Sequence, residues 1–81
     1  MSEDQILRRV EAVSRRVFGR ENVELRRETT AADVAEWDSL SHMQLIMALE
    51  KEFGMRFGLS DIAGLANVGD LVDILAAKAS R

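Results

Sequence analysis

Asp38, Ser39 and Leu40 open the strongest helical pattern of the chain, and their types could support phosphate chemistry. Ser39 would lie at the N-terminal end of that helix, where free backbone N–H groups and the helix dipole favour an anion. A phosphodiester on the Ser39 oxygen would therefore be well placed, which makes Ser39 a candidate attachment point for a phosphate-linked group. Serine and aspartate are also preferred helix caps, so the tripeptide by itself is weak evidence.

Ser39, His42 and Asp38 also raise the alternative of a small serine hydrolase. Ser39 and His42 are three residues apart and could meet on the surface of a helix. A working triad, however, needs a base that a third group orients, and an oxyanion site in a shaped pocket. One exposed helical turn supplies neither, so we assign no catalytic residue.

Two apolar strips run along the helix predicted over residues 39–53. The first has the spacing of one helix face and comprises Leu45, Ile46, Leu49 and Phe53. The second comprises Leu40, Met43 and Met47. Because a helix in so short a chain is rarely buried on all sides, we expect the first strip to form core and the second to be partly exposed. Flexible methionines suit a surface that meets several partners, although they could instead fill an irregular core.

Length and composition exclude several classes of protein. The 81 residues should form a single domain over 1–81, with room for one small core, and the apolar fraction of 47% is that of a globular chain. With no cysteine and one histidine, a disulfide framework is excluded and we predict no metal site. The chain has no apolar run of transmembrane length and no signal-peptide core, so we expect a cytoplasmic protein without membrane insertion.

Charge is unevenly spread along the chain. Residues 1–27 carry seven arginines against five acids, a balance of +2, whereas residues 28–81 carry nine acids against four bases, a balance of −5. The acidic part contains Ser39, which argues against nucleic acid as a partner and against a helix-turn-helix DNA binder with a basic recognition helix. It favours protein partners with basic surfaces.

Three other helices are predicted around the 39–53 helix. The first follows a capping box at Ser2 and Gln5 and can end at Gly19. A very short helix opens at residues 60–62 and ends at Gly64, and the last helix begins after a cap at Asn67.

Two connections link these helices. Residues 20–37 form a long loop that three apolar side chains should pin to the core, namely Val23, Leu25 and Val34. Loops of this length are often functional. Residues 55–59 are interpreted as an extended connector with three apolar plugs, namely Met55, Phe57 and Leu59.

Residues 37–40 and 47–54, with the apolar spacing between them, resemble the signature of the acyl carrier protein family. The resemblance spans essentially the whole chain and implies an all-α, acyl-carrier-like bundle of three main helices plus one short helix, with a long loop between the first two. It implies that a phosphopantetheinyl transferase attaches 4′-phosphopantetheine from coenzyme A to Ser39. The thiol of this arm would carry an acyl, aminoacyl or polyketide group as a thioester, and the chain itself would not be an enzyme.

The resemblance also implies a partner-binding face, made up of Asp38, Leu40, Met43, Met47, Glu50 and Ile62. Its partners would be an acyl-loading ligase or transferase and synthases or transferases with basic docking patches, and the carrier would act as a monomer. The arginine-rich first helix is unlike that of carriers that serve bulk fatty-acid synthesis. Trp37 before the Asp-Ser-Leu is more similar to stand-alone carriers of specialised pathways. The alternative is a small helical adaptor that uses the Met43/Met47 face, which would leave the acid–serine–leucine start unexplained.

Overall fold

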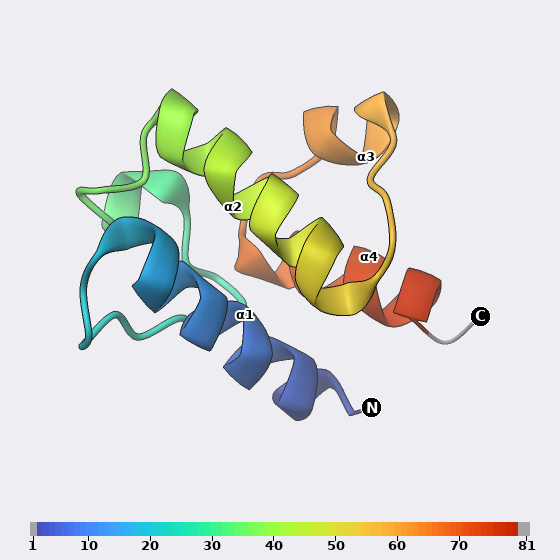
Figure 1. The fold of residues 1–81 in the computed structure, drawn as a ribbon, viewed down its shortest axis with the longest axis horizontal. Coiled ribbons are helices and arrows are strands. Elements are labelled where there is room, and N and C mark those ends of the chain that lie inside the picture. Colours follow the sequence, from blue (N-terminus) through green and yellow to red (C-terminus); the bar gives the residue numbers. More distant parts are fainter. Residues whose placement is uncertain (1, 80–81) are drawn as a thin grey trace.

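The computed structural model describes residues 2–79 and contains four α-helices (Figure 1). They are α1 (Glu3–Phe18), α2 (Ser39–Phe53), α3 (Leu59–Ala63) and α4 (Val68–Ala79). The described residues include no strand, and one 3₁₀ turn, Ala31–Asp33, lies in the long α1–α2 connection. The predicted all-α fold is therefore confirmed. The prediction that residues 1–81 form one domain includes Met1, Ser80 and Arg81, which lie outside the described residues.

Capping residues mark the ends of α1 and α2. The Ser2 side chain accepts the Gln5 N–H and Gln5 returns a bond to the Ser2 N–H, so the predicted capping box of α1 is present. Gly19 and Gly54 end α1 and α2 in the left-handed region, with φ of 68° and 63°. This conformation costs glycine little because it has no Cβ. Both predicted stops are confirmed.

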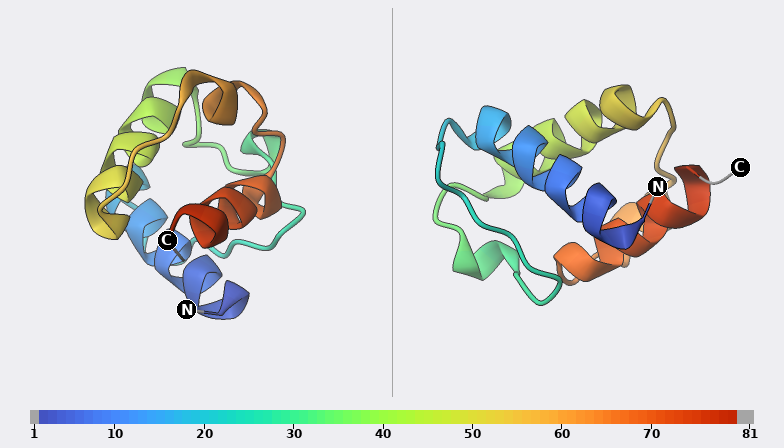
Figure 2. Two further views of the ribbon diagram at one scale, coloured as in Figure 1. Left: turned by 90° about the vertical axis from the view of Figure 1, so that its right-hand side faces the viewer. Right: turned by 90° about the horizontal axis from the view of Figure 1, so that it is seen from below.

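The core lies where α1 packs against α2 and α4 (Figure 2). Its most deeply buried large side chains come from these three helices and include Ile6, Val10, Val13, Leu45, Ile46, Leu49, Leu71, Val72 and Leu75. The first strip of α2 thus faces inward as predicted, with Phe53 half-buried at its end. Burial of a side chain of this kind contributes about 1.5–3 kcal/mol, so apolar burial dominates the stability of this bundle.

The long α1–α2 connection is fixed to the helices at both ends of its path. Its three predicted anchors, Val23, Leu25 and Val34, are buried. Further along the chain, the first amides of α4 donate to this loop, from Val68 N–H to the Thr29 carbonyl and from Gly69 N–H to the Arg27 carbonyl at 2.7 Å. A Cβ at position 69 would lie 3.0 Å from that carbonyl oxygen, so a larger residue there would crowd the loop backbone.

Glu11 is a buried carboxylate of α1 that sequence patterns did not reveal. It is 6% exposed and accepts the Leu25 N–H at 2.9 Å, while Arg8 and Arg15 each approach it to 3.3 Å. A buried charge of this kind must be paired and hydrogen-bonded to be tolerated. Glu11 therefore ties the start of the long loop to α1, the scaffold on which α2 rests.

The interpretation of residues 55–59 is wrong at Leu59. Phe57 is buried and Met55 is half-buried against the core, but Leu59 is 88% exposed. The reason is that α3 begins at Leu59, one residue earlier than expected, with Gly58 as its cap. Glu50 holds the connector from the other side, because its Oε2 accepts the Phe57 N–H at 2.9 Å.

Candidate functional site

Ser39 is the first residue of α2 and its side chain is exposed. Asp38, the preceding residue, caps the helix and its Oδ1 accepts the Ser41 N–H at 2.8 Å. The cap is therefore Asp38, and the Ser39 hydroxyl is engaged by no hydrogen bond within residues 2–79. An exposed, unengaged hydroxyl at the positive end of a helix suits a serine that carries an external phosphate.

The carboxyl group of Asp38 has a pKa below its ordinary value of 3.8, chiefly because the Ser41 backbone N–H donates to the carboxylate. A lowered pKa means that this cap stabilises α2 fully above pH 3.8 and loses its effect as the pH falls through the lower, folded-state pKa. We expect the Ser41 amide resonance to titrate with a midpoint below 3.8 in a series of NMR spectra. The variant Asp38→Asn keeps an acceptor oxygen but should abolish this titration; an unchanged midpoint would contradict the assignment.

The second strip of α2 is exposed, as predicted. Leu40 is 69% exposed, Met43 45% and Met47 65%, and Leu59 of α3 is the other large apolar side chain exposed among the described residues. The alternative in which the two methionines fill the core is therefore wrong. An apolar strip that begins beside Ser39 is a natural contact surface for proteins that act on this serine.

Trp37 and His42 form a pair directly next to Ser39, which sequence patterns did not reveal. The Trp37 Nε1–H donates to His42 Nδ1 at 2.9 Å, and the two rings stack with their centroids 5.9 Å apart. Phe18, the last residue of α1, packs against Trp37, and their ring centroids are 5.9 Å apart. His42 is half-buried, and Trp37, the ring it stacks on, is 9% exposed.

These contacts also decide against the hydrolase alternative. His42 Nδ1 already accepts the tryptophan N–H, and Asp38 accepts the amide of Ser41. Neither group forms a hydrogen bond with Ser39 or with the other, so a Ser–His–Asp relay is not assembled. Within the part of the chain that the structure describes, no group of acidic, histidine or cysteine side chains could hold a metal ion.

Two of the predicted partner residues lie apart from the exposed strip. Glu50 is half-buried and its carboxylate is used by the Phe57 N–H, while Ile62 of α3 is half-buried against the core. Lys78 pairs with Asp61 of α3 at 3.3 Å. The structure thus brings Asp38, Leu40, Met43 and Met47 together along α2, and places Glu50 and Ile62 at its margin.

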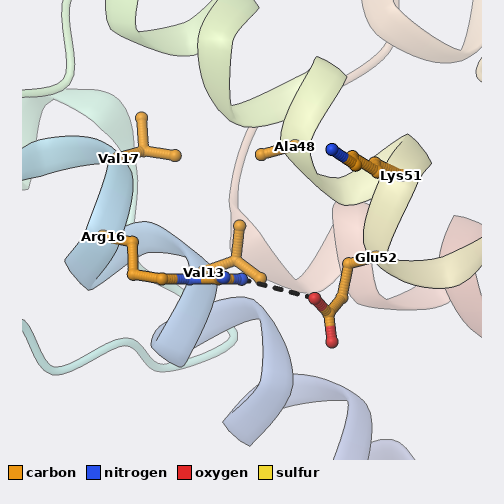
Figure 3. Close-up of a pocket in the computed structure, with 6 residues that line it drawn as sticks. All are labelled: Val13, Arg16, Val17, Ala48, Lys51 and Glu52. Atoms are coloured by element: carbon orange, nitrogen blue, oxygen red, sulfur yellow. Dashed lines mark hydrogen bonds and ion pairs between the residues drawn. The ribbon is translucent and has the colours of Figure 1, made fainter.

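A groove between α1 and α2 lies away from Ser39 (Figure 3). It is lined by Val13, Arg16, Val17, Ala48, Lys51 and Glu52. Arg16 Nη2 bridges to Glu52 Oε1 at 3.3 Å across it, and the side chains drawn in Figure 3 show this ion pair spanning the two helices. Ala48 and Glu52 follow Ser39 by about 14–20 Å along the helix at 1.5 Å per residue, so the groove is no part of the serine site.

Ion pairs inside the chain offset much of the uneven charge in its sequence. Arg9 and Arg16 of α1 pair with Glu52, and Arg20 pairs with Glu36, whose pKa is lowered by that guanidinium hydrogen bond. Several acids of the second part of the chain are therefore engaged by arginines of the first. Next to Ser39, the negative charge is that of the exposed Asp38 carboxylate.

None of the described helices is both long enough and apolar enough to cross a membrane.

The family model described as "Phosphopantetheine attachment site" matches residues 8–75. The acyl carrier protein of Acidothermus cellulolyticus is 30% identical over 94% of this chain and 90% of its own length. The acyl carrier protein of Prochlorococcus marinus is 31% identical over 96% of this chain and 98% of its own length.

A solved structure gives the same result in three dimensions. The solution NMR structure of holo acyl carrier protein from Geobacter metallireducens superposes with a TM-score of 0.89 and 42% sequence identity, over 94% of this chain and 87% of that one. The four-helix architecture, the match to a phosphopantetheine attachment model and the likeness to a holo carrier all agree. The chain therefore belongs to the acyl carrier protein family, whose members carry a covalently attached 4′-phosphopantetheine.

Proposed function

We propose that Ser39 is the residue that holds the 4′-phosphopantetheine arm of this acyl carrier protein. One observation carries the assignment, namely the exposed hydroxyl of Ser39 at the first turn of α2, with Asp38 taking the role of cap. The chain contains no cysteine, so the arm supplies the thiol on which an acyl group is carried as a thioester. Loading by coenzyme A and a phosphopantetheinyl transferase, followed by intact mass, tests the proposal.

Attachment needs only a small contribution from this chain. The Ser39 oxygen forms a bond to the phosphorus next to the pantetheine of coenzyme A, the bond from that phosphorus to the bridging oxygen breaks, and 3′,5′-ADP leaves. The serine proton must go to a base. Because Asp38 and His42 both already accept hydrogen bonds from Ser41 and Trp37, we infer that the transferase supplies this base. The carrier contributes an accessible nucleophile and a favourable field, and we propose that it is not itself an enzyme.

Partner enzymes should bind along α2. The exposed strip of Leu40, Met43 and Met47 supplies apolar area, and Asp38 supplies a charge for the basic docking patches that we propose on transferases, acyl-loading ligases and synthases. Apolar contacts of this kind dominate binding energy, while charge steers encounter. Glu50 and Ile62 stay predicted contacts at the edge of this face. The cytoplasmic location, the monomeric state and a specialised pathway also stay predictions.

Met47→Glu should weaken binding to at least one partner enzyme while leaving arm attachment measurable. Met47 is 65% exposed, so the change should not disturb the core, but it places a charge in the apolar contact area. The measurement is the apparent affinity of each partner for the loaded carrier. Ala12→Glu is the matched control, because Ala12 is an exposed apolar residue of α1, away from the strip. Equal affinity of every partner for both variants would count against this face.

A further inference from the structure

An open hollow lies directly beside Ser39 and is distinct from the groove of Figure 3. Its lining consists of Ala31, Trp37, Asp38, Ser39, His42 and Met43. We call it the Ser39 hollow. Apart from Asp38, Ser39 and His42, the lining is apolar, and the hollow is wide open to solvent. It runs from the serine hydroxyl toward the 3₁₀ turn of the long loop.

Behind the Trp37–His42 pair the space is far smaller. A cavity of about 50 Å³ lies between that pair, Leu65 of the α3–α4 connection and Leu71 of α4. The core side chains Leu45, Leu49 and Leu75 are 0% exposed. The pair therefore forms a wall, and a group attached to Ser39 meets the outer face of that wall.

We infer that the Ser39 hollow is a binding seat for the apolar part of the arm that lies nearest its phosphate, with Trp37, Met43 and Ala31 as the contacting residues. The inference rests on the proposal that Ser39 holds the arm. In 4′-phosphopantetheine a quaternary carbon with two methyl groups follows the phosphate ester by one methylene. An apolar group so close to the Ser39 oxygen must lie near the surface around that serine, and the Ser39 hollow is the apolar depression there.

The wall of this seat is held by contacts within the chain. Trp37 is fixed by the hydrogen bond to His42, by stacking on that ring and by the Phe18 ring. A pre-organised surface binds at a lower entropy cost than one that must be ordered. Because His42 Nδ1 accepts, the neutral ring carries its proton on Nε2, which is left as a donor for an oxygen of the arm. We accordingly assign His42 as a positioning residue, which holds the contacting ring of Trp37 in place.

The test is an NMR experiment on isotope-labelled protein loaded with an unlabelled arm from coenzyme A. Intact mass first establishes that loading is complete, so failure of loading and failure of the seat give different results. We expect nuclear Overhauser contacts from the two arm methyl groups to Trp37 and Met43, and methyl resonances shifted from those of free coenzyme A. Trp37 and His42 are the chain's one tryptophan and one histidine, so their side-chain signals are unambiguous. Arm methyl resonances at their free positions, without contacts in fully loaded protein, would overturn the seat.

Paired variants separate the seat from a general effect on α2. Met43→Gln should cause loss of the arm contacts, whereas Met47→Gln should keep them, because both methionines are exposed but only Met43 lines the hollow. His42→Ala should shift the Trp37 indole N–H resonance and weaken the contacts, and His42→Gln, which retains an acceptor, should restore both in part. Equal contacts in Met43→Gln and Met47→Gln would contradict the assignment of the Ser39 hollow.

Discussion

Replacing Ser39 by alanine is expected to reduce phosphopantetheine attachment to zero while the helical bundle stays intact. The side chain is exposed and forms no hydrogen bond among the described residues, so its oxygen contributes little to folding. The cap of α2 is Asp38, which the substitution leaves in place. Attachment is measured by incubation with coenzyme A and a phosphopantetheinyl transferase followed by intact mass, and folding by circular dichroism.

Ser41→Ala is the matched control for this experiment. Ser41 lies two residues further along the same helical turn and its amide donates to Asp38, but its hydroxyl is not assigned to the arm. We expect this variant to accept the arm at a rate close to that of the wild type. Attachment to Ser39→Ala, or loss of attachment in Ser41→Ala alone, would place the arm elsewhere.

Leu49→Ala should strongly destabilise the bundle. Leu49 is 0% exposed, and truncating a buried leucine costs about 2–5 kcal/mol, since apolar contacts are lost and a cavity remains. A chain of this length has a free energy of unfolding of about 4–12 kcal/mol, at roughly 0.05–0.15 kcal/mol per residue. Urea unfolding followed by circular dichroism should therefore show a markedly lower midpoint, with little change in slope.

Met47→Ala provides the comparison within the same helix. Its side chain is 65% exposed, and changes at such surface positions usually alter stability by less than about 0.5 kcal/mol. The two variants together test which strip of α2 is buried. Similar losses of stability in both would mean that the assignment of the inner and outer strips is wrong.

Helix periodicity made most of the fold predictable. The Leu45–Leu49 spacing and the stops at Gly19 and Gly54 depend on local backbone geometry and on burial of one helix face, which a sequence displays directly. The exposed position of Met43 and Met47 followed from the same periodicity, because one small bundle cannot bury two faces of a helix.

The contacts that support the serine site were less accessible to sequence reasoning. Trp37 lies before α2 and His42 within it, so their bond depends on how the loop enters the helix and has no periodic signal. The bond from the Leu25 N–H to Glu11 also depends on the path of the loop, so it too has no periodic signal. Leu59 was misplaced because the one-residue difference in the start of α3 decides which way its side chain points.

Localisation of the arm on the wild-type protein tests the central claim most directly. After incubation with coenzyme A and a transferase that loads a reference carrier, tryptic cleavage at Arg27 and Lys51 gives a peptide of residues 28–51 that contains both Ser39 and Ser41. Fragment-ion mass spectrometry of that peptide should show one phosphopantetheine, on Ser39. A folded protein that stays unmodified, or one that carries the group on another residue, would contradict the account.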